Sequence, residues 1–167
     1  SKLAISKGES FDITVTCNSG YEVASLMVKG VEKLEDAMKN ANGGVYTIKA
    51  TDGNQEIRVT FKKCDGYNLT GVVKGDDTSL SAKVIVTGET NRILRYEVSA
   101  AGDKGYKVNM PAGKYAVYAE AEDYIPVTEK IDLRKDTVKD FVLKRSAFAK
   151  AVEVNGKTVY SNTEVWD

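Results

Sequence analysis

Short runs in which apolar and polar residues alternate are the feature that most limits how this chain can fold. In residues 11–17, FDITVTC, the side chains of Phe11, Ile13, Val15 and Cys17 fall on one side. Successive side chains of a β-strand point to opposite faces, so this alternation is typical of a strand with one buried face. Similar runs recur about every 8–12 residues, separated by turn signals. The pattern predicts a mainly all-β chain.

The first set of runs predicts a small β-sandwich-like module over residues 1–64. It contains one helical segment, a short helix near 31–40. There Val31, Leu34 and Met38 have helical spacing, and the following Asn- and Gly-rich stretch ends the helix.

A second set of runs predicts another β-sandwich-like module over residues 65–145, in tandem with the first and joined to it by a linker at CDGYN. Residues 146–167 contain a predicted hairpin at Asn155-Gly156. This segment is too short to bury a core of its own. It is either a tail docked on the second module or the start of a truncated third domain.

Two turn signals predict β-hairpins within the modules. An Asp-Gly pair in TDGNQ lies between the runs VYTIKA and EIRVTFKK. The turn Pro111-Ala112-Gly113 lies between alternating runs that extend from Tyr106 to Ala121. We therefore expect each of these pairs of runs to form paired antiparallel strands.

The composition argues against several classes of function. Histidine is absent, which removes Ser-His-Asp catalysis and His-ligated zinc and favours a non-catalytic chain without a cofactor. Lys+Arg and Asp+Glu are both 24, so no excess of positive charge indicates binding to nucleic acid. No apolar run approaches the ~18 residues that span a bilayer, so no membrane insertion is expected. The chain begins at Ser1 without a signal peptide, and we interpret it as a piece of a longer protein.

The two cysteines, Cys17 and Cys64, have two interpretations. Both lie in the first module, so a disulfide between them is topologically allowed. The alternation places Cys17 among buried apolar residues, which favours two free thiols instead. Two cysteines are too few for a Cys-only zinc site.

The second module has a series of motifs that resembles the carboxypeptidase regulatory-like family. In chain order, they are Gly71, Thr87-Gly88, Gly105-Tyr106, Pro111-Ala112-Gly113 and Asp123-Tyr124. The resemblance implies a seven-stranded transthyretin-like (prealbumin-like) sandwich over 66–144. Asp123 stands where the family more usually has glycine, and aspartate tolerates turn geometry.

The first module is similar to small β repeats of Gram-positive surface and secreted proteins. The matching features are Gly20-Tyr21, Lys29-Gly30, Val45-Tyr46 and the run Ile57 to Phe61. Together the two resemblances imply accessory or spacer domains of a large extracellular or cell-surface bacterial protein, often one that acts on glycans. The expected partners are neighbouring domains of the same protein, and we expect the chain to be a monomer.

Exposed aromatic residues are the candidates for a ligand-binding site. Alternation in KYAVYAEAE places Tyr115, Val117 and Ala119 on the core face and Tyr118, Glu120 and Glu122 on the other face. Tyr118 is the tyrosine expected to be exposed. It could stack on a sugar ring while the two carboxylates accept hydrogen bonds from sugar hydroxyls. This predicts a carbohydrate-binding module as the alternative to a spacer; the plainer interpretation is an ordinary solvated strand face.

Three aspartates in predicted turns, Asp76, Asp77 and Asp103, could supply oxygen ligands for calcium. No D-x-D-x-D-G loop surrounds them, and turn chemistry accounts for all three. We therefore predict no metal site.

Overall fold

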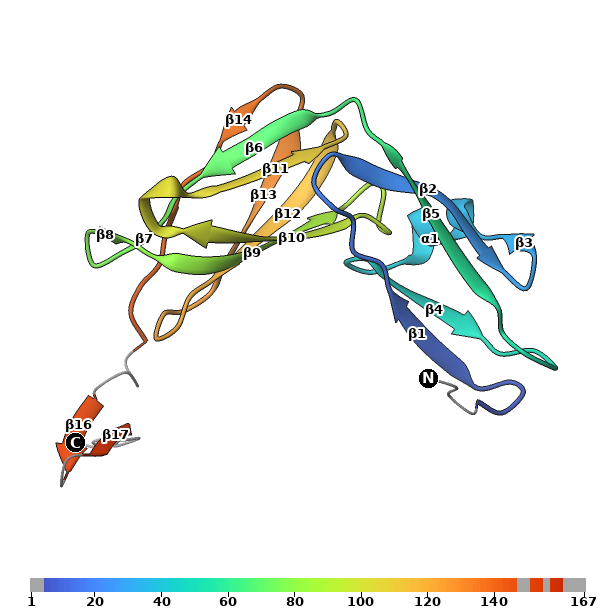
Figure 1. Cartoon of the computed structure of the whole chain (residues 1–167), viewed down its shortest axis with the longest axis horizontal. Coiled ribbons are helices and arrows are strands. Elements are labelled where there is room, and N and C mark those ends of the chain that lie inside the picture. Colours follow the sequence, from blue (N-terminus) through green and yellow to red (C-terminus); the bar gives the residue numbers. More distant parts are fainter. Residues whose placement is uncertain (1–4, 147–150, 155–156, 161–167) are drawn as a thin grey trace.

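The computed structural model describes residues 5–146 with their side chains and the backbone of two further strands at 151–154 and 157–160. The prediction of a mainly all-β chain with one short helix is confirmed. Figure 1 shows the strands of the first module and those of the second as two groups that meet near β2 and β11. The helix, α1, has seven residues, and in the described part of the chain no helix is long and apolar enough to cross a membrane.

The first module consists of two small antiparallel sheets. Its elements are β1 (Ser10–Thr14), β2 (Tyr21–Val28), β3 (Val31–Glu32), α1 (Leu34–Asn40), β4 (Val45–Lys49) and β5 (Ile57–Lys63). One sheet pairs β1 with β4, and the other has the order β3-β2-β5. The core between them includes Val23, Leu26 and Ile48, all buried.

The predicted helix near 31–40 begins at Leu34, later than expected, because Val31 and Glu32 form β3. Lys29 and Gly30 have φ angles of 50° and 77°, which close a tight hairpin between β2 and β3. Val31 is consequently 54% exposed. The Glu32 carboxylate accepts hydrogen bonds from the Leu26 and Leu34 N–H groups, at 2.9 and 3.0 Å. It thereby satisfies one of the free N–H groups at the start of the helix.

The second module is a sandwich of two sheets. Its strands are β6 (Tyr67–Gly71), β7 (Val73–Gly75), β8 (Thr78–Ser79), β9 (Ser81–Gly88), β10 (Arg95–Ala101), β11 (Tyr106–Met110), β12 (Gly113–Glu120), β13 (Val127–Leu133), β14 (Thr137–Val138) and β15 (Phe141–Val142). A 3₁₀ turn, η1 (Gly102–Lys104), links β10 to β11.

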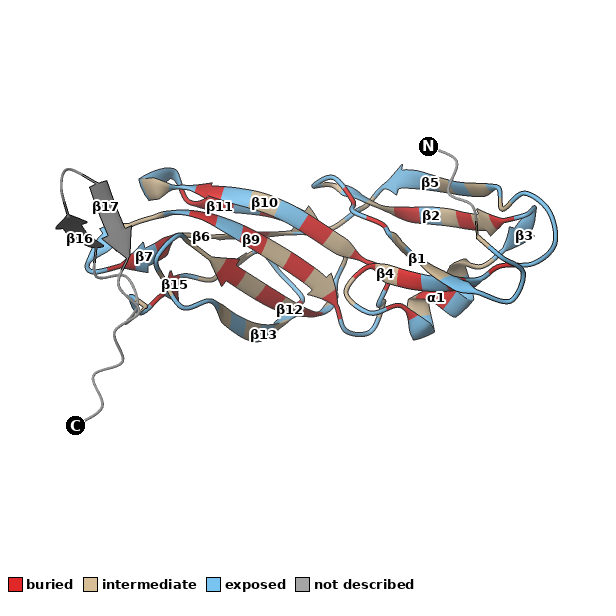
Figure 2. Cartoon of the chain, turned by 90° about the horizontal axis from the view of Figure 1, so that it is seen from below, coloured by how far each residue is buried: buried red, intermediate tan, exposed pale blue. Residues whose placement is uncertain are grey.

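One face of this sandwich is the four-stranded sheet β10-β9-β12-β13, and the other is built from β11-β6-β14 and β15-β7-β8. Between β6 and β7, the Asp140 carboxylate accepts the Val72 N–H at 2.9 Å, and the pairing continues from β6–β14 to β7–β15. Figure 2 shows buried residues alternating with more exposed ones along β9, β10 and β12. The alternation read from the sequence is thus the alternation between core and solvent.

Both predicted hairpins within the modules are wrong in their pairing, although all four runs are strands. β11 pairs with β6 in one sheet, and β12 pairs with β9 and β13 in the other. Likewise β4 pairs with β1, and β5 pairs with β2. Each turn therefore carries the chain from one sheet to the opposite one. In both cases the two strands joined by the turn lie in facing sheets and bury their apolar sides against each other. Alternation of apolar and polar residues is the same in this arrangement and in a hairpin, so it does not distinguish them.

The hairpin predicted at Asn155-Gly156 is confirmed in its strands. β16 (Ala151–Val154) pairs antiparallel with β17 (Lys157–Tyr160), with Val154 opposite Lys157. The turn residues themselves lie outside the described residues.

Backbone hydrogen bonds join the two modules. The Cys17 N–H donates to the Arg95 carbonyl at 2.7 Å, and Cys17 forms a parallel bridge with Tyr96. Nearby, the Gly20 N–H donates to the Asn109 carbonyl at 2.9 Å. The junction is therefore a short stretch of shared β-structure rather than a linker alone.

Side chains and tight backbone contacts reinforce this junction. The buried Tyr96 hydroxyl donates to the Tyr21 carbonyl at 2.7 Å. The Gly44 N–H donates to the Arg92 carbonyl at 3.1 Å. One continuous cluster of buried residues includes Val15 of the first module and Tyr96 of the second. The two sandwiches thus share a single hydrophobic core.

The chain passes through the pair of modules from end to end. In the first module, Thr14 of β1 lies near the junction, whereas Ser10, paired with Lys49, lies at the far end of the strand. In the second module, Arg95 at the start of β10 touches the junction, and Ala101 lies at the other end. The chain leaves the sandwich after β15, which pairs with β7 at the end far from the junction (Figure 1).

Candidate functional site

The predicted face of β12 points away from the core. Tyr115, Val117 and Ala119 are buried, as the alternation predicted. Tyr118 and Glu120 alternate with them along β12 and lie on the outer face of the four-stranded sheet. The strand therefore presents these two side chains because its other face is committed to the sandwich core.

Glu122 does not belong to this strand face, contrary to the prediction. β12 ends at Glu120, and Glu122 is an exposed residue of the turn that follows. The turn continues through Asp123, whose φ angle of 67° is left-handed. Side-chain alternation ends where the extended backbone ends, so the spacing inferred from a strand does not apply to the two glutamates.

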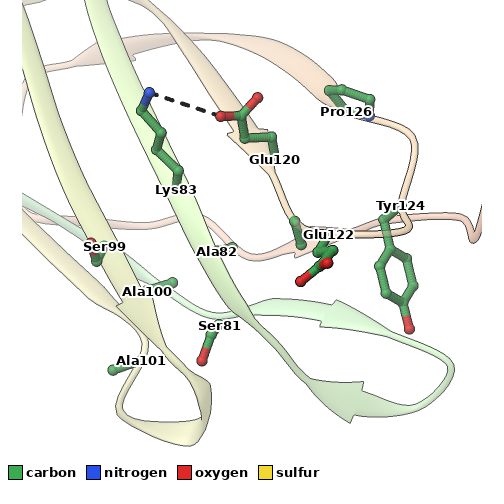
Figure 3. Close-up of a pocket in the computed structure, with 11 residues that line it drawn as sticks. Ser81, Ala82, Lys83, Ser99, Ala100, Ala101, Glu120, Glu122, Tyr124 and Pro126 are labelled. Carbon is green, nitrogen blue, oxygen red and sulfur yellow. Dashed lines mark ion pairs between the residues drawn. The ribbon is translucent and has the colours of Figure 1, made fainter.

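Glu120 and Glu122 nevertheless line one open hollow of about 770 Å³. Its floor is made of small residues on β9 and β10: Ser81, Ala82, Ser99, Ala100 and Ala101. Lys83, Ala121, Tyr124 and Pro126 complete the lining. Figure 3 shows Glu120 facing Lys83, with Glu122 and Tyr124 beyond the end of β12. The hollow exists because short side chains lie between longer ones.

The polar groups of the hollow are connected through Glu120. Lys83 is its cross-strand neighbour, and the Lys83 Nζ lies 3.9 Å from Glu120 Oε1. The Tyr118 hydroxyl donates to Glu120 Oε2 at 2.7 Å. This hydrogen bond is the main reason why the pKa of the Tyr118 phenol is raised. Together these groups could exchange hydrogen bonds with a hydroxyl-rich ligand.

Tyr118 is less exposed than predicted. It is half-buried between its neighbours on the adjacent strands, Ile85 and Thr128. Two other tyrosines are more exposed, Tyr21 at 37% and Tyr67 at 38%. Tyr118 also lies beside the hollow rather than in its lining. A ligand that stacks on the Tyr118 ring would therefore contact it at the rim of the hollow rather than inside it.

The wall formed by Tyr124 is held in place by a cluster of charged groups. Arg145 Nε donates to Asp76 Oδ2 at 2.6 Å, and the Tyr124 hydroxyl donates to the same oxygen at 2.9 Å. The Arg145 guanidinium lies 5.0 Å from the centre of the Tyr124 ring. These hydrogen bonds lower the pKa of Asp76. They explain Asp76 as an anchor for the departing chain rather than as a calcium ligand.

Sequence reasoning did not single out Lys83, Ser81 or Ser99. Each belongs to a strand whose place beside β12 depends on sheet order and register. Their outward direction could be read from alternation, but their proximity to Glu120 could not.

Cys17 and Cys64 are both free thiols, at the junction between the modules. Burial raises the pKa of the Cys17 thiol to about 11. Cys64 is half-buried, and its Sγ lies 3.5 Å from the Asn109 Oδ1. Among the residues that the structure describes, no three Cys, Asp or Glu side chains lie close enough together to hold a metal ion.

The fold and the hollow define an all-β protein of two joined sandwich-like modules with a small polar surface site. No model of a known protein family matches the chain, and a comparison with curated proteins finds no significant relative.

Proposed function

We propose that the chain is a non-catalytic accessory segment that spaces and orients neighbouring domains of a larger bacterial protein. The observation that carries this proposal is the end-to-end course of the chain through a hydrogen-bonded junction. The Cys17–Arg95 and Gly20–Asn109 backbone bonds oppose bending between the modules. Because the chain passes through the first module and then the second, domains attached at its two ends would be held apart by the joined modules.

The resemblance to the carboxypeptidase regulatory-like family supports the accessory role and an extracellular or cell-surface location. Two of the glycines in the family pattern occupy positions that this sandwich needs. A Cβ at Gly71 would lie 1.8 Å from the Lys139 carbonyl oxygen. Gly105 has a φ angle of 63°, and its Cβ would lie 2.1 Å from the Gly71 carbonyl oxygen. Both residues therefore allow close packing of β-structure, which is the role expected of a structural motif.

A distance measurement between the modules tests the spacer proposal. The chain contains no histidine. A pair of histidines introduced two residues apart on an exposed strand would therefore bind copper(II) without competition from native histidines. We would place one pair at Arg58 and Thr60 of β5 and another at Thr128 and Lys130 of β13, all four exposed. Electron paramagnetic resonance should give one narrow distance distribution. A broad distribution, as from modules on a flexible tether, would overturn the proposal.

The hollow beside Tyr118 favours carbohydrate binding as a second candidate function. Its hydroxyl, carboxylate and ammonium groups match the hydrogen-bonding needs of sugars, and the Tyr118 ring lies at its rim. A glycan array followed by calorimetry tests this candidate. Binding should be lost in Glu120→Gln and Tyr118→Ala and retained in Tyr67→Ala, which changes an exposed tyrosine outside the hollow. A spacer alone gives no signal on the array.

A further inference from the structure

The open edge of β4 borders an apolar groove of about 540 Å³ in the first module. Val28 and Val31 of the β2–β3 hairpin form one side of the groove, and Tyr46 and Ile48 of β4 form the other. Val31 is 54% exposed, although an aliphatic side chain gains by burial. Val28, Tyr46 and Ile48 are largely buried, so Val31 is the apolar side chain that the groove leaves open, between two strands that do not pair with each other.

Along this edge Val45 is paired with Asn42, whereas the backbone groups of Thr47 and Lys49 are unpaired within the described residues. The Ala50 N–H donates to the Glu9 carbonyl, and the Val15 N–H donates to the Gly44 carbonyl. In an antiparallel pair the hydrogen-bonded positions alternate, so Tyr46 and Ile48 also bond to β1. Thr47 then directs its N–H and C=O away from β1, as does Lys49. Within the described residues these groups have no hydrogen-bond partner, so an added strand could pair with them.

The rim of the groove is positively charged. Three lysines contribute to its lining, Lys29, Lys33 and Lys49, and no aspartate or glutamate does. None of the three forms an ion pair in the described part of the chain. Lys29 Nζ is held at one end of the groove by the Thr51 hydroxyl and the Asp52 carbonyl. A second copy of this chain would bring the same lysines to the edge, and like charges oppose such pairing.

We propose that this groove binds an extended, acidic segment of another polypeptide, which adds to β4 as a further strand. Alternate side chains of such a segment point to opposite sides. Apolar side chains on one side would cover Val31. Carboxylates on the other side and at the ends would meet Lys33 and Lys49. The chemistry of the partner is therefore an alternation of acidic and aliphatic residues.

A labelled peptide, acetyl-Asp-Val-Glu-Ile-Asp-Val-Glu-amide, tests the proposal by fluorescence anisotropy on the full chain. The same peptide with lysine at every acidic position should bind at least about tenfold more weakly, because its charge matches the rim. A version N-methylated at the residues whose N–H groups face β4 keeps the charge but loses those hydrogen bonds, and should not bind. In amide NMR spectra, the acidic peptide should shift the Thr47 and Lys49 resonances.

Substitutions in and outside the groove test whether the peptide binds there. The double variant Lys33→Glu, Lys49→Glu should reverse the preference between the acidic and basic peptides. Lys63→Glu, on exposed β5, should leave the preference unchanged. Thr47→Pro removes an outward N–H and should abolish binding, whereas Thr47→Val keeps that N–H and should bind. If Thr47→Pro does not fold, the N-methylated peptide makes the same test. The proposal would be overturned if the acidic peptide did not bind at concentrations up to about 1 mM. It would also be overturned if neither the charge reversal nor N-methylation changed the affinity.

Discussion

Gly44 is the position where a single methyl group should disturb the junction between the modules most directly. Its φ angle is +80°, and a Cβ added there would lie 2.4 Å from the Arg95 Cβ and 2.9 Å from the Val15 carbonyl oxygen. Gly8 provides a matched control. Its φ angle is +87°, and no described atom outside its immediate neighbours lies within 4 Å of an added Cβ. Both glycines belong to the first module, so Gly44→Ala and Gly8→Ala differ chiefly in the contact with the second.

The expected magnitudes follow from these two geometries. A left-handed backbone conformation costs an alanine about 1–2 kcal/mol, and both variants bear this cost. Gly44→Ala additionally forces Arg95 and the strand carrying it to move, at a cost typical of overpacking, about 1–3 kcal/mol. The free energy of unfolding should therefore fall by about 1–3 kcal/mol more in Gly44→Ala than in Gly8→Ala.

Urea unfolding followed by circular dichroism measures this difference. With a denaturant slope of about 2 kcal/mol per molar urea, an additional loss of 2 kcal/mol lowers the midpoint by ~1 M. The copper(II) distance between the modules should also change in Gly44→Ala and stay constant in Gly8→Ala. Equal unfolding midpoints for the two variants would refute the view that close backbone packing at Gly44 couples the modules.

Three further predictions concern the buried groups of the junction. Under native conditions a disulfide-exchange reagent should modify Cys64 well before Cys17, which is 3% exposed; Cys64→Ser should remove the fast phase, and equal rates would contradict the assigned burial. Because burial raises the pKa of Cys17 from 9.0 to about 11, the unfolded state loses this proton first as pH rises above 9. The free energy of unfolding should then fall by up to ~1.4 kcal/mol per pH unit between the two pKa values and level off above the higher one. Urea titrations across pH 9 to 10 should show a smaller slope in Cys17→Ala, and an unchanged slope would exclude Cys17 as its source. Tyr96→Phe removes the hydroxyl that donates to the Tyr21 carbonyl and should cost about 1–3 kcal/mol, whereas Tyr118→Phe, which changes a surface contact, should cost within about 0.5 kcal/mol; equal losses in thermal unfolding would contradict this assignment.

The strands and their inward faces could be predicted because alternation is a local property. Tyr115, Val117 and Ala119 were placed in the core from spacing alone, and the structure buries all three. The helix was predicted three residues too long at its start, because Val31 has helical spacing to Leu34 but is drawn into a hairpin by Lys29-Gly30. A tight turn with two left-handed residues therefore outweighs a helical spacing.

Strand partners could not be predicted in the same way. The turn at Pro111-Ala112-Gly113 has the signature of a hairpin, yet it connects β11 in one sheet to β12 in the other. A reversing loop satisfies the same local rules whether the two strands pair edge to edge or face each other across a core. Which of these occurs depends on competing strands such as β6 and β9, which lie many residues away in the sequence.

The candidate site was predicted only in the part that belongs to one strand. Tyr118 and Glu120 were read correctly as outward residues, and the structure joins them by a hydrogen bond. Glu122 was misplaced because its strand ends early, and Lys83 was missed because its position opposite Glu120 depends on register. The junction at Cys17 and Tyr96 could likewise not be predicted from the sequence, because it brings together residues from different modules.

Residue order is enough to predict short strands with one apolar face each, because an extended backbone places successive side chains on opposite faces. The tertiary structure alone decided which strands pair, how the two sandwiches join at Gly44 and Tyr96, and which edge stays open at β4. Those outcomes depend on the total apolar surface that can be buried at once, a quantity that belongs to the whole chain rather than to any segment.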